Sequence, residues 1–207
     1  FKDLSMADVP RVGGKTASLG EMFNALRPLG VRVPDGFGVT ATAYRDALEA
    51  AGAWPKLHAL LDGLDKRDVQ ALAHAGAAAR EIVYAAPMPA AVVAGLRAAW
   101  RELQAVDGPT LSVAVRSSAT AEDLPNASFA GQHDTYLNVR GEQMLIDAVK
   151  RCQASLFTDR AISYRTDQGF DHFKVSLSVA VMQMVRSDQA CSGVMFRFLA
   201  LVFLSSV

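Results

Sequence analysis

Two kinds of hydrophobic spacing occur along the chain and predict a mixture of helices and strands. Within residues 16–29 the apolar side chains fall at i, i+3, i+4 and i+7, which is the spacing of one helical face. Residues 111–115 and 175–185 instead alternate apolar side chains with others, as a strand with one buried face does. Helices and strands follow one another without a regular βαβ order. The pattern therefore predicts an α+β fold.

The rest of the chain is mostly helical in pattern. A helix is expected over residues 43–51, after a Pro-Asp-Gly turn at residues 34–36. Residues 53–108 are rich in alanine and carry a last helix that Pro89 opens near its first turn. A short β-prone run at residues 135–139 follows, and then two helices, the second capped by Thr158.

The character of the sequence changes at residue 111, and this change predicts two subdomains. Residues 1–110 would form a helix-rich subdomain and residues 111–196 a strand-bearing one. Residues 197–207 contain an unbroken apolar run, far shorter than the roughly 20 residues that span a bilayer. We expect this tail to be aberrant, from a truncation, a frameshift or an incomplete gene model. Its exposed apolar surface would favour self-association.

Composition excludes several classes of protein. The 207 residues are 51% hydrophobic, which is too apolar for a disordered chain. Twenty-one basic residues balance 21 acidic ones, so charge gives no reason to expect nucleic acid or an anionic membrane as a partner. Cys152 and Cys191 lack a CxxC spacing and lie in apolar segments, which predicts buried, reduced thiols. The first residues show no signal-peptide pattern, so a cytoplasmic location is expected.

Residues 12–22, VGGKTASLGEM, contain the Gly-Gly-Lys-Thr end of a phosphate-binding P-loop without its beginning. A P-loop needs a glycine at the position of Val9, and Pro10 interrupts any strand there. What remains is a glycine turn before a helix, where free N–H groups and the helix dipole favour an anion. Lys15 adds a mobile positive charge. The alternative is an ordinary helix entry with a solvated lysine.

Arg116 follows the strand that begins near residue 111 and precedes a loop of small residues. Its planar guanidinium suits phosphate oxygens, and hydroxyl donors follow it at Ser117, Ser118 and Thr120. The loop around Gly131 has little side-chain bulk and could close over a ligand. The alternative is a structural ion pair between Arg116 and Glu122 or Asp123.

Gln183 takes an inward-facing position in the alternation of residues 175–185, where an apolar side chain is expected. A buried amide needs hydrogen-bond partners, and the polar edge of an adenine ring would supply them. Val185, Met182 and Met184 would form apolar walls for such a ring. The alternative is an amide satisfied by the protein backbone.

In this order, the three features resemble the phosphoenolpyruvate synthase (pyruvate, water dikinase) family. The resemblance runs from about Pro10 to Phe196 and is weakest over residues 53–108. It rests on VGGKTASLGEM, GVRVPDGFGVTATAY, VAVRSSATAEDLPNASFAGQHDTYLNVRG, SLFTDRAISYR, QGFDH and MVRSDQACSGVMF. The chain is less similar to pyruvate, phosphate dikinase, whose glycine loop is built differently. Rifampicin phosphotransferase shares the core motifs and is the enzyme alternative, and a non-catalytic nucleotide-binding module is the alternative from another class.

The resemblance implies the N-terminal part of an ATP-grasp nucleotide-binding domain. The full family enzyme converts ATP, pyruvate and water to phosphoenolpyruvate, AMP and phosphate, through a swivelling histidine domain and a pyruvate-binding barrel. Carried over to this sequence, the basic residues would hold the phosphates, the glycine loop would cover them, and the last strand would line the adenine pocket. The residues expected at the nucleotide are Lys15, Arg116, Ser117, Gly131, Thr135, Gln183 and Val185.

The resemblance also implies what these 207 residues lack. The family's magnesium ligands, swivelling histidine and barrel lie beyond the matching segment, so no catalytic or metal-binding residue is expected here. Phosphoryl transfer needs a metal to neutralise charge. We therefore expect weak ATP binding without turnover, with pyruvate a partner of the full-length enzyme alone.

Overall fold

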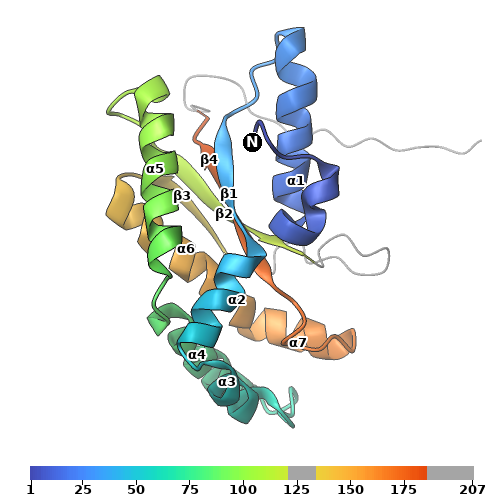
Figure 1. The fold of residues 1–207 in the computed structure, drawn as a ribbon. Coiled ribbons are helices and arrows are strands. Elements are labelled where there is room, and N and C mark those ends of the chain that lie inside the picture. The colour runs from blue at the N-terminus through green and yellow to red at the C-terminus, as the bar shows by residue number, and fades with distance from the viewer. Residues whose placement is uncertain (121–133, 186–207) are drawn as a thin grey trace, which may run out of the picture.

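The computed structural model describes residues 1–120 and 134–185 (Figure 1). Gly131, Cys191 and the tail over residues 197–207 lie outside this range. The helices are α1 (Val9–Leu26), α2 (Ala41–Ala50), α3 (Trp54–Leu61), α4 (Val69–Ala85), α5 (Ala90–Asp107), α6 (Glu142–Ala154) and α7 (Asp159–Asp167). The strands are β1 (Gly36–Val39), β2 (Val113–Ala119), β3 (Thr135–Val139) and β4 (Leu177–Gln183). Short 3₁₀ helices are η1 (Met6–Asp8), η2 (Arg27–Leu29) and η3 (Ser155–Phe157).

The four strands form one antiparallel sheet in the order β1-β4-β2-β3. The last strand, β4, is therefore central and lies between β1 and β2. The α+β class predicted from the sequence is confirmed. Because β1 comes from residues 1–110 and β4 from residues 111–196, the two expected subdomains share this sheet, and the division between them stays a prediction.

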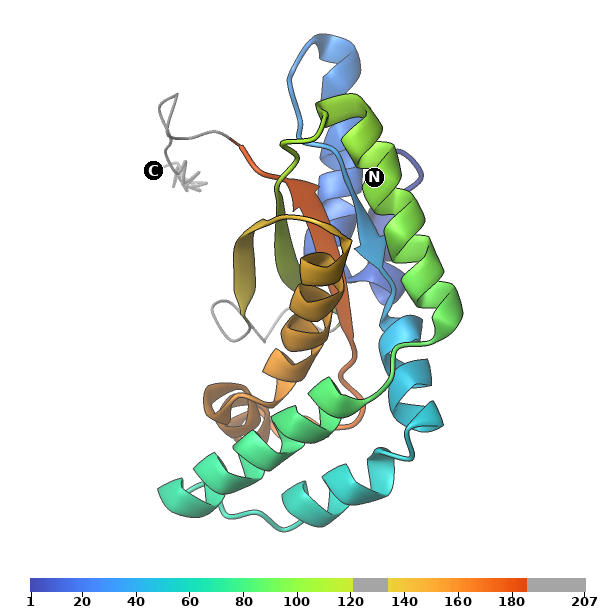
Figure 2. The ribbon, with the colours of Figure 1, turned by 90° about the vertical axis from the view of Figure 1, so that its left-hand side faces the viewer.

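The two faces of the sheet are covered by different helices (Figures 1 and 2). Helix α1 lies on one face, while α5 and α6 lie on the other. The face toward α6 is apolar, because Val113 and Val115 of β2 and Val179 and Val181 of β4 point into a core with buried side chains of α5 and α6. The face toward α1 carries small polar side chains, which allow that helix to approach closely.

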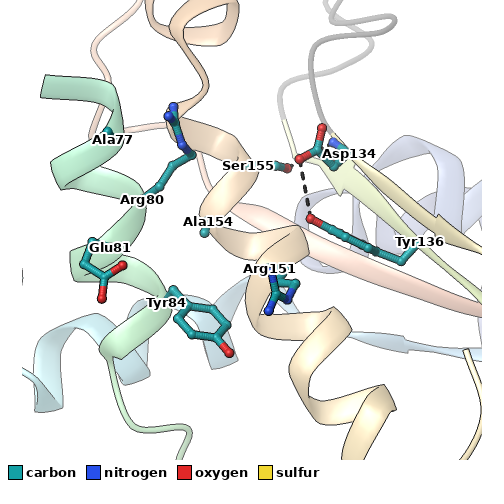
Figure 3. A pocket seen from close by; sticks show the side chains of 9 residues that line it. All are labelled: Ala77, Arg80, Glu81, Tyr84, Asp134, Tyr136, Arg151, Ala154 and Ser155. Carbon is teal, nitrogen blue, oxygen red and sulfur yellow. Dashed lines mark hydrogen bonds between the residues drawn. The ribbon is translucent and has the colours of Figure 1, made fainter. Parts of the chain in front are cut away.

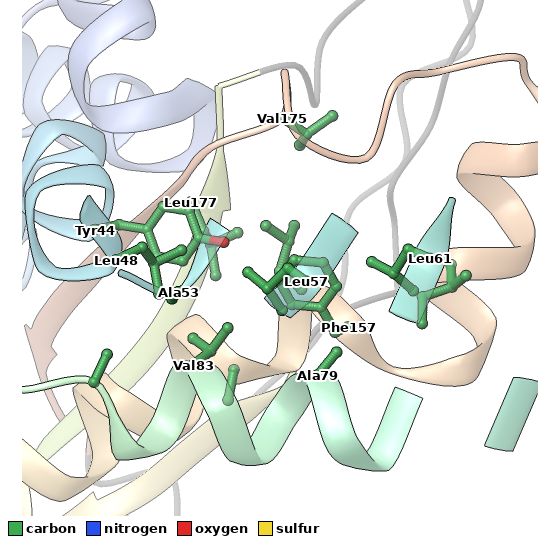
Figure 4. Close-up of a cluster of buried hydrophobic side chains, with 14 of the residues drawn as sticks. Tyr44, Leu48, Ala53, Leu57, Leu61, Ala79, Val83, Phe157, Val175 and Leu177 are labelled. Carbon is green, nitrogen blue, oxygen red and sulfur yellow. The ribbon is translucent and has the colours of Figure 1, made fainter. Parts of the chain in front are cut away.

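A second core lies beyond one end of the sheet and joins several helical segments (Figure 4). Side chains of α2, α3, α4 and η3 pack around Tyr44, Leu57 and Phe157, each at most 1% exposed. The end of β4 enters this core through Leu177. This helical core fixes the position of α7, which follows η3.

Most elements match their expected positions, with informative differences in β2 and α1. The expectation that Arg116 follows its strand is wrong, because β2 continues through Arg116 to Ala119 in its pairing with β4. Helix α1 begins at Val9 rather than Thr16, but Gly13 interrupts it with non-helical angles (φ 72°, ψ 165°). The glycine turn and the main helix are thus both present as predicted. The Thr158 hydroxyl accepts from the Ala161 amide and caps α7, which confirms that expectation.

No single helix among the described residues is long and apolar enough to cross a membrane. Among these described helices, α4 and α5 would be long and apolar enough only if they were taken together, as a bent pair.

Candidate functional site

The glycine turn at the start of α1 is anchored to the centre of the sheet. Gly13 has a φ of +72°, and a Cβ on it would collide with the carbonyl oxygen and the hydroxyl of Ser118. The Thr16 amide donates to Ser118 Oγ over 3.1 Å. Ser178, the cross-strand neighbour of Ser118, donates its hydroxyl to the Val12 carbonyl. Two serines of β2 and β4 therefore hold the chain on both sides of the turn.

This anchoring changes the expected anion site at the helix start. The sequence predicts free N–H groups there, but the Thr16 amide already donates to the hydroxyl of Ser118. Ser118 of β2 therefore caps the helix as an N-cap side chain would. The turn therefore offers fewer amides to a ligand than predicted. Its position is informative instead, because it sets the Lys15 backbone beside the end of β2.

Arg116 and Thr135 lie next to each other on this same face of the sheet. They are direct partners in the β2–β3 pairing. Arg116 stands two residues before Ser118, and alternate residues of a strand share a face. Arg116 is half-buried and Thr135 is exposed, so both are open to a ligand at the β3 edge of the α1-covered face.

The backbone of Lys15 lies beside the end of β2, and its charge acts on Cys152 of α6. Burial and the Asp134 carboxylate raise the pKa of the Cys152 thiol to about 12, and the Lys15 ammonium opposes that rise. The Cys152 sulfur lies 3.5 Å from the carbonyl oxygen of Asp134, the residue before β3. The Thr16 hydrogen bond places the Lys15 backbone beside Ser118, two residues along β2 from Arg116, which is paired with Thr135. The meeting of the three side chains at one ligand stays a prediction.

Ser117 and Gln183 lie on the opposite face. Ser117 is 4% exposed and pairs with Val179 on the side of α6. The Gln183 side chain accepts from the Asp35 amide over 2.6 Å and donates to the Asp107 carboxylate. Its carbonyl oxygen thus has a backbone partner, as in the alternative interpretation of the sequence, while its NH2 group is bound by a side chain instead. Gln183 is also three residues along β4 from Ala180, the partner of Arg116, or about 10 Å.

The remaining expected site residues are only partly placed. Val185 follows β4 and is 59% exposed, so its apolar side chain is open to a ligand. Gly131, and the Glu122 and Asp123 of the alternative ion pair, lie outside the described residues. In the described ranges, no group of three His, Cys, Asp or Glu side chains could hold a metal ion.

A pocket of about 430 Å³ opens between α4, α6 and the start of β3 (Figure 3). Most of its polar side chains already bind one another or nearby groups. Tyr84 and Arg151 both donate to Asp147, and these hydrogen bonds hold the pKa of that carboxyl below its usual range. Asp134 accepts a hydrogen bond from Tyr136. The pocket contains none of the expected nucleotide residues. A second pocket, of about 700 Å³, lies between β3 and α6 and reaches Thr135.

Sequence reasoning missed a buried polar group at the end of α7. The side chain of Arg165 is 0% exposed, and its Nε donates to His172 Nδ1 over 3.0 Å. Both residues lie in motifs that carried the family resemblance, SLFTDRAISYR and QGFDH, but neither received a role. Arg165 follows the buried Ile162 by three residues, a helical spacing that would have placed it on the buried face of α7.

This contact predicts a loss of stability in mild acid. Burial, followed by the Arg165 charge, lowers the pKa of His172 to about 4, against about 6.5 in the unfolded chain. The unfolded state therefore binds more protons between these values, and stability falls as the pH drops from 6.5 to 4. We expect a loss of about 1–2 kcal/mol, since His172 is part-exposed. Urea unfolding at several pH values measures it.

The matched variants for this prediction are His172→Gln, which keeps an acceptor but cannot titrate, and His74→Gln, at an exposed histidine. The first should flatten the slope of stability against pH, and the second should leave it unchanged. Equal slopes in all three proteins would contradict the assignment.

Comparison with known proteins identifies a family whose members resemble this chain in sequence. The family described as pyruvate phosphate dikinase, AMP/ATP-binding domain, matches residues 9–199. Phosphoenolpyruvate synthase from Helicobacter pylori is 51% identical over 197 residues, which cover 95% of this chain and 24% of that protein. The Pseudomonas aeruginosa and Escherichia coli phosphoenolpyruvate synthases are 55% and 52% identical, over 93% and 95% of this chain. The chain spans about a quarter of the length of these curated relatives.

Proposed function

The chain belongs to the family of pyruvate phosphate dikinase AMP/ATP-binding domains, and from this premise we propose that it binds ATP on the α1-covered face of its sheet. The observation that supports this proposal is the pairing of Arg116 with Thr135 on the strand whose Ser118 anchors the glycine turn, next to the Lys15 backbone. Two cations and a hydroxyl at one strand edge form a donor set suited to phosphate oxygens.

Each residue has a distinct proposed role. Arg116 would bind two phosphate oxygens through its planar guanidinium. Lys15 would add an ammonium charge on a flexible side chain that can adjust to the ligand. Thr135 would donate its hydroxyl, and Gly131 would belong to a loop over the phosphates. Val185 would pack its exposed side chain against the base.

Two of the residues fit the nucleotide less directly. Gln183 would reach an adenine only after its amide leaves Asp107, so we propose that it mainly positions the end of β4. Ser117 would support Arg116 from the opposite face rather than touch the ligand.

A proposal for the whole enzyme rests on the relatives named phosphoenolpyruvate synthase. We propose that the chain is the first part of an ATP-grasp domain in a dikinase that makes phosphoenolpyruvate, AMP and phosphate from ATP, pyruvate and water, in the cytoplasm. The described residues do not fit a magnesium site, so the metal, pyruvate and the transfer step would belong to the rest of such an enzyme. Alone, the chain would be inactive, and self-association through apolar surface is part of the proposal.

Calorimetric titration of the purified chain with ATP, with and without magnesium, tests this function. We expect saturable but weak binding, with a dissociation constant of about 1 mM, which corresponds to about 4 kcal/mol. No release of phosphate or AMP should accompany it. Absence of saturable binding would contradict the proposal, and tight binding independent of magnesium would favour a dedicated nucleotide-binding module.

A further inference from the structure

The guanidinium of Arg165 is buried without partners for most of its donors. The side chain is 0% exposed at the end of α7. Among the residues that the structure describes, only Nε of this group makes a hydrogen bond, to His172, while Nη1 and Nη2 have none. Four N–H donors of a permanently charged group are thus unsatisfied in the interior. Groups of this kind are nearly always paired in folded proteins.

A second unsatisfied donor comes from another helix. Tyr44 of α2 is 1% exposed, and its hydroxyl also lacks a partner. Figure 4 shows this side chain in the second core, with Leu177 and Leu48 beside it. Burial raises the pKa of Tyr44 above its usual range, and the nearby Arg165 charge opposes the rise. Phe157, whose ring packs against the Arg165 guanidinium, belongs to the same buried cluster as Tyr44, so α2 and α7 bring both groups to this core.

The surroundings of this space are positive or apolar. The Phe157 ring packs 5.5 Å from the Arg165 guanidinium carbon. Arg45, the second cation that acts on Tyr44, donates to Ser176 Oγ over 3.0 Å. In the described part of the chain, no carboxylate lies within ion-pair distance of Arg165 or Arg45. The positive charge of Arg165 is therefore not balanced by any described side chain.

Deprotonation of Arg165 does not remove its uncompensated positive charge at neutral pH. Burial lowers the pKa of Arg165 to about 10, so the group stays charged at neutral pH. Water could accept the hydrogen bonds but would bring no charge. A buried charge without a counter-charge is unfavourable, and a bound anion would offset that cost.

We propose that a chloride ion binds between the Nη atoms of Arg165 and the hydroxyl of Tyr44. The unsatisfied donors come from two helices and are buried beside one apolar core, which favours a small monatomic anion over phosphate. The ion would link α2 to α7 across the second core. It is a structural site, separate from the proposed nucleotide face.

Unfolding of the full chain in urea, at constant ionic strength, tests this site when gluconate is replaced by chloride. Because chloride binds the folded state alone, raising it from 10 to 300 mM should lower the unfolding equilibrium constant about tenfold. Chloride-35 NMR should show line broadening that bromide reverses. No chloride effect in the wild-type chain would overturn the proposal.

Two variants separate this site from general salt effects. Tyr44→Phe and Arg165→Met should each lose most of the chloride dependence and the line broadening, while Arg140→Met, at an exposed arginine, should keep both. If Arg165→Met does not fold, Tyr44→Phe still tests the chloride site, because this variant removes a single hydroxyl and should keep the fold. Unchanged chloride dependence in Tyr44→Phe would contradict the site.

Discussion

Replacing Gly13 by alanine is expected to lower the free energy of unfolding by about 3–4 kcal/mol. Two causes act together at this position. The backbone angles (φ 72°, ψ 165°) belong to a region that is essentially restricted to glycine. A Cβ would also collide with Ser118, whose hydroxyl caps the Thr16 amide. Urea unfolding followed by circular dichroism measures the loss.

Gly95→Ala is the matched control. Gly95 lies inside α5, and a Cβ there meets nothing within 4 Å. Alanine should stabilise that helix by about 0.5–1 kcal/mol, because it restricts the unfolded chain more than glycine does. If both variants were equally stable, the anchored turn would not be essential to the fold.

Local patterns were sufficient for most of the helices and strands. The helical spacing of the 16–29 segment and the Thr158 cap depend on residues within one or two turns of each other, so they are visible in the sequence. The strand over residues 135–139 also matches its expected bounds. These elements needed no knowledge of distant partners.

The arrangement of the sheet could not be derived in this way. The last strand pairs with both β1 and β2, and nothing in its own alternation specifies that central position. The capping of Thr16 by Ser118 joins residues 102 positions apart. Contacts of this kind depend on the assembled fold rather than on local spacing.

The candidate site likewise contains features that local sequence predicts and contacts that depend on distant residues. The pairing of Arg116 with Thr135 follows from strand register, and the bond between Thr16 and Ser118 brings the Lys15 backbone to the same strand. The phosphate site itself stays a prediction. The inward position of Gln183 was recognised, but its partners, Asp35 and Asp107, come from distant segments. For Ser117 the two-residue period already implied the opposite face from Arg116.

The loss of the Arg116 charge should have the largest effect on ligand binding. Hydrogen bonds to charged groups contribute about 1.5–3 kcal/mol each, so Arg116→Met should weaken ATP binding roughly 10- to 100-fold. Lys15→Met should act in the same direction, with a smaller effect because lysine offers a point charge rather than a fork. Neither variant should change the folded state, which circular dichroism would verify.

The control for this experiment is Arg101→Met, which removes an equal charge from the exposed side of α5, across the sheet from Arg116. Calorimetric titration of ATP into the wild-type chain and both variants, at one ionic strength, is the most direct test of the proposed nucleotide face. The account predicts that Arg116→Met alone loses at least tenfold in affinity. Equal affinity in all three proteins, or an equal loss in Arg101→Met, would contradict it.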